Sequence, residues 1–153
     1  MVGLISDTHG LLRPGAVEAL RGAEQIIHAG DVGRQEILDE LRAIAPVTAV
    51  RGNIDKGAWA SRLPPTAIVQ AALTRIYVLH DVKELDLDPA AAGFGIVVSG
   101  HSHKHRQSER DGVLYVNPGS AGPRRFRLPI TLARLYLDEL APRVEFVELT
   151  PGG

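Results

Sequence analysis

The sequence predicts a mixed α/β (α+β) protein built from two β-sheets with helices on the outside. In the first half of the chain, short apolar runs alternate with segments whose apolar residues recur at helical spacing, which is typical of β/α units. The second half consists mainly of short apolar runs, which favour strands. Alternating units followed by a series of strands indicate sheets and helices packed in layers.

Three strands and two helices are expected in the first half. The strands occupy residues 2–6, 25–29 and 47–50, and the turn residues Gly52-Asn53 end the third. Arg13-Pro14 opens the first helix, because proline is favoured at the first helical position; this helix is expected to bury Val17 and Leu20 and to stop near Gly22. The second helix spans residues 35–45 and places four apolar side chains at helical spacing: Ile37, Leu38, Leu41 and Ile44.

The second half is expected to contain strands at residues 67–70, 75–79, 96–98, 113–116, 131–137 and 144–149. Ala71-Ala72-Leu73-Thr74, between the first two, is a poor turn sequence because it has none of the usual turn residues. Leu140-Ala141-Pro142 is expected to turn the chain between the last two strands. No repeat, low-complexity tract or linker divides the sequence, so residues 1–153 are predicted to form a single domain.

Composition narrows the classes of function. The chain has no cysteine, which excludes disulfides, zinc fingers, iron–sulfur clusters and thiol catalysis. Its formal net charge is −1 and only 5% of its residues are aromatic, so a binder of long nucleic acids is not expected. No apolar run is long enough to cross a membrane, and the first residues lack the features of a secretion signal, so we expect a cytoplasmic protein without a membrane partner.

Five short segments carry nearly all of the candidate chemistry. Each follows the carboxyl end of an expected strand, where sites assemble in sheet proteins that have helices on their faces. Glycine lies in four of the five and lets the backbone turn tightly there. The segments are Ser6-Asp7-Thr8-His9-Gly10, Gly30-Asp31, Gly52-Asn53-Ile54-Asp55, Leu79-His80-Asp81 and Gly100-His101-Ser102-His103.

These residue types together favour a metal centre. Imidazole, carboxylate and amide ligands without thiolate suit manganese, iron or zinc better than a purely oxygen-ligated magnesium. Two such ions, about 3.5–4 Å apart, can share a carboxylate and a water and hold both oxygens of an in-line displacement at phosphorus. Taken singly, each segment also has an ordinary explanation, because Gly-Asp and Gly-Asn are common turns and a lone histidine is often a hydrogen-bonded core residue. The ordered set of five favours the metal.

Two further histidines have two interpretations each. His28 lies inside an apolar strand and is expected to be a hydrogen-bonded core residue or one that orients a metal ligand. His105, between Lys104 and Arg106, indicates either a solvated basic loop or a contact with substrate.

This ordered set resembles the calcineurin-like metallophosphoesterase superfamily, specifically its small bacterial and archaeal phosphodiesterase branch, which is similar to the phosphoesterase-like subunit of the retromer coat. The resemblance runs from Asp7 to about Gly122 and includes the loop Asn117-Pro118-Gly119-Ser120. It implies a four-layer α-β-β-α sandwich and two divalent metal ions, most often manganese and in some members nickel, cobalt, iron or zinc. It also implies that a metal-bridging hydroxide attacks phosphorus without a phospho-enzyme intermediate.

The resemblance implies a set of ligands as well. The first ion would be held by Asp7, His9 and His103. The second would be held by Asn53, His80 and His101, with Asp31 as the bridge between the two. The predicted catalytic residues are Asp31, Asn53, Asp55 and His80. Asp55 would either support the ligands or accept a proton near Asn53; its ordinary explanation is a turn residue.

Two positions depart from the family pattern. Larger relatives have histidine after the metal-binding asparagine, whereas Ile54 here cannot donate a proton. General acid–base help is worth about 10²–10⁴-fold, so weaker catalysis on poor leaving groups is expected. Many relatives also have His-Gly-His around His80, where this chain has His80-Asp81; Asp81 is expected to orient a ligand or the substrate, or simply to turn the chain.

The leading hypothesis is a two-metal phosphodiesterase acting on a small phosphoester. The alternatives are a phosphomonoesterase or nucleotide phosphatase using the same residues, a nuclease, and a weakly catalytic scaffold for protein interactions. Arg124, Arg125 and Arg127 follow the Asn117 loop and indicate a solvated basic turn or a contact with phosphate. Family habit also predicts a homodimer or homotetramer.

Overall fold

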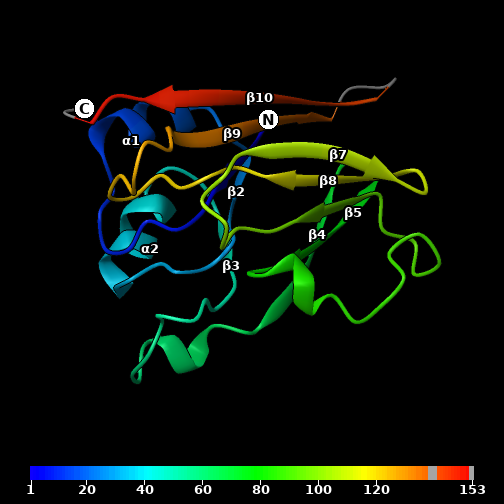
Figure 1. The fold of residues 1–153 in the computed structure, drawn as a ribbon, viewed down its shortest axis with the longest axis horizontal. Coiled ribbons are helices and arrows are strands. Elements are labelled where there is room, and N and C mark those ends of the chain that lie inside the picture. Colours follow the sequence, from blue (N-terminus) through cyan, green and yellow to red (C-terminus); the bar gives the residue numbers. More distant parts are fainter. Residues whose placement is uncertain (138–140, 152–153) are drawn as a thin grey trace.

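The computed structural model describes residues 1–137 and 141–151, and these form two five-stranded β-sheets packed face to face (Figure 1). The first sheet has the order β10-β9-β1-β2-β3 and contains β1 (Val2–Ile5), β2 (Gln25–His28), β3 (Val47–Ala49), β9 (Ile130–Leu137) and β10 (Pro142–Leu149). The second has the order β4-β5-β6-β8-β7 and contains β4 (Thr66–Ala71), β5 (Thr74–Leu79), β6 (Ile96–Val98), β7 (Arg106–Arg110) and β8 (Val113–Asn117). The predicted turn at 140–142 lies partly outside the described residues.

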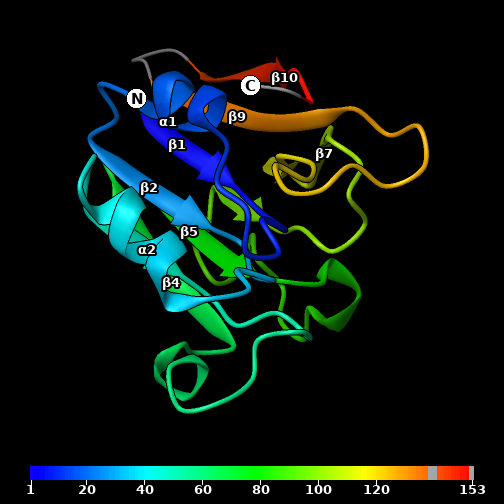
Figure 2. The same cartoon turned by 90° about the vertical axis from the view of Figure 1, so that its left-hand side faces the viewer.

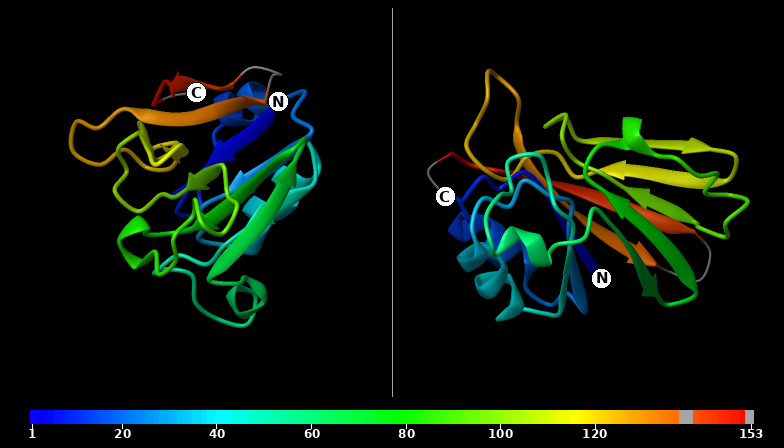
Figure 3. Two further views of the ribbon diagram at one scale, coloured as in Figure 1. Left: turned by 90° about the vertical axis from the view of Figure 1, so that its right-hand side faces the viewer. Right: turned by 90° about the horizontal axis from the view of Figure 1, so that it is seen from below.

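Successive side chains of a strand point to opposite faces, and this alternation builds the layers. In β1, Leu4 points between the sheets, while Ile5 points to the outer face of the first sheet. Two helices, α1 (Pro14–Leu20) and α2 (Gln35–Arg42), cover that outer face (Figure 2). Both α-helices therefore lie on one side of the sheets (Figure 3).

The outer face of the second sheet is covered differently. Tyr77 and Val97 pack there against Phe94 and Leu85, which belong to a long connection containing only the 3₁₀ turn η2 (Val82–Glu84). A second 3₁₀ turn, η1 (Ala60–Arg62), lies between β3 and β4. The predicted four-layer sandwich is confirmed, and its fourth layer is a connecting loop rather than an α-helix.

Several details differ from the sequence-based expectations. In α1 the buried side chains are Ala16, Ala19 and Leu20, whereas Val17 is only half-buried, so the face that packs on the sheet is made mainly of small residues. Strand β7 was not expected at all. Its five residues are polar and mostly exposed on both faces of this edge strand, so no apolar alternation marks it.

The poor turn sequence between β4 and β5 does close a hairpin. Ala72 adopts a left-handed backbone with φ of 51°, and its carbonyl accepts a 2.9 Å hydrogen bond from the Gln70 side-chain amide. A side chain thus stabilises a turn that the turn residues themselves do not favour.

Parallel pairing brings the chemistry-bearing loops to one end of the molecule. The strands β1, β2 and β3 are parallel to one another, as are β5, β6 and β8. Their carboxyl ends therefore meet at common edges, where all five candidate segments begin. Within the described part of the chain, no helix has the length and apolarity needed to cross a membrane.

Candidate metal centre

The loops after β1, β2, β5 and β6 bring six of the seven predicted ligands into two adjacent groups. The first group is Asp7, His9 and His103, and the second is Asp31, His80 and His101. Within each group one ligand atom per residue lies within 4.8 Å of the others. The resemblance implied the same partners for Asp7 and for His80, whereas Asp31, the expected bridge, falls here into the second group and Asn53 into neither.

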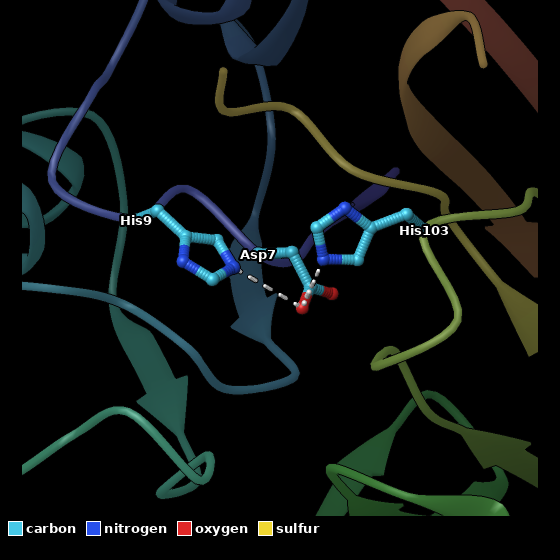
Figure 4. A group of neighbouring side chains, drawn as sticks. All are labelled: Asp7, His9 and His103. Carbon is cyan, nitrogen blue, oxygen red and sulfur yellow. Dashed lines mark ion pairs between the residues drawn. The ribbon is translucent and has the colours of Figure 1, made fainter. Parts of the chain in front are cut away.

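The first group converges on one carboxylate oxygen (Figure 4). Asp7 Oδ1 lies 3.3 Å from His103 Nε2 and 3.8 Å from His9 Nε2. Its other oxygen, Oδ2, accepts hydrogen bonds of 2.6 Å from the Ser6 hydroxyl and 3.1 Å from the backbone N–H of His101. These two donors fix the carboxylate so that Oδ1 faces the imidazoles.

The second group is linked to the first through Asp31. Asp31 Oδ2 lies 3.2 Å from His80 Nε2 and 3.5 Å from His9 Nε2, so one oxygen faces a histidine of each group. His80 Nδ1 donates to the carbonyl of Ala29 at 2.7 Å, which directs Nε2 toward Asp31 and toward His101 Nδ1, 3.3 Å away. Asp31 Oδ2 therefore lies near one histidine of each group, and its role as a bridging ligand stays a prediction.

Asn53 is exposed and lies on the loop that touches Asp31. Ile54 N–H donates to Asp31 Oδ1 at 3.1 Å, and a Cβ added to Gly52 would lie 2.1 Å from the same oxygen. The residues on both sides of Asn53 thus contact Asp31, while among the described residues the Asn53 side chain has no hydrogen-bond partner. The backbone around Asn53 thus lies next to Asp31, and the role of Asn53 as a metal ligand stays a prediction.

Five of the candidate ligands hold a backbone conformation that L-residues seldom adopt. Positive φ angles of 47–70° occur at Asp7, His9, Asp31, His101 and His103. Each such residue costs about 1–2 kcal/mol when it is not glycine. Backbone strain of this kind concentrates at functional sites, because it aims short side chains where regular structure would not place them.

The electrostatics keep the Asp7 carboxylate ionised. Burial opposes the charged form, but the facing imidazoles of His103 and His9, the hydrogen bond from Ser6 and the charge of His80 outweigh it, so the pKa of Asp7 is far below its usual value. For Asp31, burial is likewise outweighed by hydrogen bonds from His80 and the Ile54 N–H, and its pKa is lowered. Two buried carboxylates close together are thereby held as anions.

His80 experiences the opposite effect. Burial favours its neutral form, yet the hydrogen bond to Asp31, the charge of Asp7 and the hydrogen bond to Ala29 together raise the pKa of His80 to about 9. In the metal-free protein this imidazole is a cation paired with the carboxylates. A metal ion that binds its Nε2 must displace that proton.

Asp55 is buried, with 4% of its surface exposed, and its carboxylate accepts three backbone hydrogen bonds. The donors are the N–H groups of Val32 at 3.2 Å, Gly33 at 2.9 Å and Gly52 at 2.8 Å. Two of them belong to the loop of Asp31 and one to the loop of Asn53. Asp55 therefore ties together the two loops that would carry ligands of the second ion.

His28 is fully buried in β2 and hydrogen-bonded through both nitrogens, as its position in an apolar strand predicted. Nδ1 accepts from the N–H of Gly30 at 3.1 Å, so Nε2 carries the proton that faces the Thr8 hydroxyl 2.9 Å away. Thr8 in turn donates to the carbonyl of Val32 at 2.8 Å. Burial lowers the pKa of His28 to about 4, and the neutral ring fixes Thr8 between Asp7 and His9.

Asp81 and His105 lie at the rim of the site. Asp81 caps η2 by accepting from Lys83 N–H at 3.1 Å, which is the turn role considered for it; its second oxygen is 3.7 Å from His101 Nε2, and its role in orienting a ligand stays a prediction. His105 is exposed and packs against Phe146, with ring centroids 5.0 Å apart. Its side chain is thus engaged with β10 rather than with the ligand groups.

Sequence reasoning missed two residues that shape the site. Asn117 donates its side-chain amide to the carbonyl of Gly100 at 2.9 Å and to the hydroxyl of Ser102 at 3.1 Å, which holds the loop of His101 and His103. Ser6 orients Asp7, as described above. Serine before aspartate is too common to attract notice, and Asn117 was recognised only as part of a matching loop.

The donor set fits divalent metal ions. Asp7 Oδ1 and His9 Nε2 are buried and lack hydrogen-bond partners among the described residues, although buried polar atoms are nearly always paired. Both atoms face the convergence point of the first group. A cation there would satisfy an anionic oxygen and a ring nitrogen at once.

Comparison with known proteins agrees with the sequence-based resemblance in family and in fold. The model of the calcineurin-like phosphoesterase superfamily domain matches residues 1–140. A probable metallophosphoesterase of Methanocaldococcus jannaschii is 35% identical over 161 residues, covering 97% of this chain and 82% of that protein. An archaeal phosphodiesterase superposes with a TM-score of 0.80 at 22% identity, covering 95% and 99% of the two chains. Vps29 from Entamoeba histolytica, solved with zinc, gives 0.74 at 21% identity, covering 96% and 98%.

Proposed function

We propose that this chain, which belongs to the calcineurin-like phosphoesterase superfamily, hydrolyses small phosphodiesters with two divalent metal ions. One observation carries the proposal: Asp31 Oδ2 faces His80 of one ligand group and His9 of the other, at 3.2 and 3.5 Å. A carboxylate shared between two adjacent groups is the feature that separates a two-ion centre from two unrelated sites.

In this proposal Asp7, His9 and His103 hold one ion, Asn53, His80 and His101 hold the other, and Asp31 joins them. When bound, the ions would supply positive charge for the phosphoryl oxygens and lower the pKa of an attacking water. Manganese is the first metal to test, with iron, zinc, nickel and cobalt as comparisons, because the ligands are imidazoles and oxygens without thiolate.

The protein's own groups prepare this site before substrate arrives. The carbonyl of Ala29 fixes the ring of His80, so that only Nε2 is available on the ligand side. Asp55 fixes the loops of Asp31 and Asn53 from behind through three backbone hydrogen bonds. Ile54, which is 43% exposed beside the centre, offers no proton, so the leaving group must depart with little help from this position.

The proposal is tested with purified protein that is stripped by a chelator and reconstituted with Mn²⁺. We expect hydrolysis of an activated aryl phosphodiester that requires metal and falls at least about 10³-fold in Asp31→Ala and His80→Ala. Asp39→Ala is the control, because Asp39 is exposed on α2. Hydrolysis that survives both site substitutions would contradict the proposal. The archaeal phosphodiesterase with the same fold is the reason to test diesters before monoesters.

A further inference from the structure

A groove beside the metal centre contains charged and aromatic groups that the proposed reaction does not use. It is lined by Ser102, Lys104, Phe126, Arg127 and Leu128, which we call the rim groove. The first two residues belong to the loop after β6, and the other three to the loop between β8 and β9.

The groove lies at the same end of the molecule as the ligands. Ser102 stands between the ligands His101 and His103 in the chain. The loop between β8 and β9 is anchored at Gly122, where an added Cβ would lie 2.5 Å from the Asp7 carbonyl oxygen. Because β9 is antiparallel to β1, the loop that leads into β9 must lie at the carboxyl end of β1, as the ligand Asp7 does.

Phe126 is exposed to solvent rather than packed in the core. Its side chain is 93% exposed, and its φ of 54° places a bulky residue in the left-handed region. A large apolar side chain that is both exposed and strained has no structural benefit to offset its cost. An exposed ring beside a phosphoester site provides a stacking platform for a flat ring, which is worth about 1–3 kcal/mol per base.

The charges around Phe126 are positive and unpaired. Lys104, Arg124, Arg125 and Arg127 are all exposed, and within the described parts of the chain none forms an ion pair with a carboxylate. The chain as a whole has a formal net charge of −1, so this excess is local. Lys104 and Arg127 line the groove itself and are suited to hold an anion.

We propose that the rim groove binds the part of the substrate beyond the scissile phosphate, and that this part is a nucleotide. The base lies on Phe126, and a second phosphate lies between Lys104 and Arg127. The substrate class is then a short nucleotidyl diester that carries an additional phosphate. This inference rests on the proposed function, because the scissile phosphate must lie at the metal centre.

Calorimetry on the Mn²⁺-loaded protein tests the inference with three probes: inorganic phosphate, adenosine monophosphate and adenosine 3′,5′-bisphosphate. We expect affinity to rise in that order, by about fivefold for the base and again for the second phosphate. Phe126→Ala should weaken both nucleotides by about fivefold. Lys104→Gln and Arg127→Gln should each weaken the bisphosphate by about three- to tenfold and phosphate far less.

Two control variants lie at the opposite end of the sheets. Leu73→Ala removes a fully exposed apolar residue from the β4–β5 turn, and Arg110→Gln removes an exposed positive charge next to the β7–β8 turn. Neither should change the affinity for any probe.

The outcomes separate the two proposals. If phosphate and the bisphosphate bind equally well, or if the groove variants weaken both equally, the rim groove is not a nucleotide site while the metal centre stands. If wild-type protein neither binds phosphate nor hydrolyses an activated diester, the proposed function fails and this inference fails with it.

Discussion

Asp55→Ala is the substitution that most directly tests how the site is held together. The carboxylate of Asp55 is buried and accepts backbone hydrogen bonds from the loops of Asp31 and Asn53. Alanine leaves three backbone N–H groups without an acceptor. Asp55→Asn is the graded companion, because an amide oxygen in place of Oδ2 keeps the bonds from Val32 and Gly52, whereas its NH₂ group would face the N–H of Gly33.

The expected magnitude follows from these contacts. A hydrogen bond to a charged group contributes about 1.5–3 kcal/mol, and a buried donor without a partner costs a similar amount. Water can enter near the rim and satisfy part of the loss, so three lost bonds should reduce the free energy of unfolding by about 3–5 kcal/mol. Asp55→Asn, with one bond lost, should cost about 1–2 kcal/mol.

Urea denaturation of the metal-free protein measures these losses, and metal titration against a competing chelator measures the second effect. We expect Asp55→Ala to weaken binding of the second ion at least about tenfold, because both loops lose their common anchor. Asp39→Asn alters only exposed contacts with Gln35 and Arg42 on α2, so it should change stability by less than about 0.5 kcal/mol and leave metal affinity unchanged. A loss below about 0.5 kcal/mol for Asp55→Ala would refute the reasoning. If Asp55→Asn abolished hydrolysis with stability and metal affinity intact, Asp55 would act in the chemistry, as the sequence prediction allowed.

Three further predictions test the charge, the packing and the chemistry of the site. In metal-free protein, the pKa of His80 is raised from 6.5 to about 9, so its pairing with the carboxylates should add up to about 3 kcal/mol to the free energy of unfolding below pH 6.5. This contribution should be lost as the pH rises through 9. Denaturation at pH 6 and pH 9.5 should show the fall in stability, and His80→Gln should remove it. Gly52→Ala places a Cβ 2.1 Å from Asp31 Oδ1, so it should lower the free energy of unfolding by about 1–3 kcal/mol and reduce metal affinity in the chelator competition. The control is Gly112→Ala, which has open space around the added Cβ and should keep that affinity. Ile54→His should speed hydrolysis of diesters with poor leaving groups by about tenfold or more, while an activated aryl diester changes little.

Each of these three has an outcome that contradicts it. A metal-free protein that is equally stable at pH 6 and pH 9.5 would mean that His80 is not paired as the structure indicates. Unchanged metal affinity in Gly52→Ala would mean that the Asp31 loop can move aside. An equal gain on good and poor leaving groups in Ile54→His would exclude proton donation as its cause.

Much of the fold could be predicted because its strands are buried on one or both faces. The apolar runs of β1, β2 and β6, for example, can be recognised as strands in the sequence. Strand β7 has no apolar pattern that could be recognised, because it is an edge strand whose side chains face solvent. The hairpin after β4 was poorly marked as well, since its turn depends on a hydrogen bond from Gln70 that no turn rule describes.

The site shows a similar division between side-chain identity and backbone geometry. Asp7, His9, His80, His101 and His103 could be recognised because imidazole and carboxylate recur after successive strands. The interactions that aim them could not, because they join residues far apart in sequence. The hydrogen bond from His101 N–H to Asp7, for example, spans 94 positions. Pairings of this kind exist only once the two sheets have met.

The precision of the centre therefore resides in the backbone as much as in the ligands. Five ligand positions carry positive φ angles, and at about 1–2 kcal/mol each their strain is comparable to the whole stability of a small protein. Such strain persists only where surrounding contacts over-determine it, and Asp55, His28 and Asn117 provide those contacts through buried or partly buried hydrogen bonds. None of the three needs to touch a metal ion to matter. Substitutions behind the ligands should consequently damage metal binding through geometry alone, even though every predicted ligand is still present.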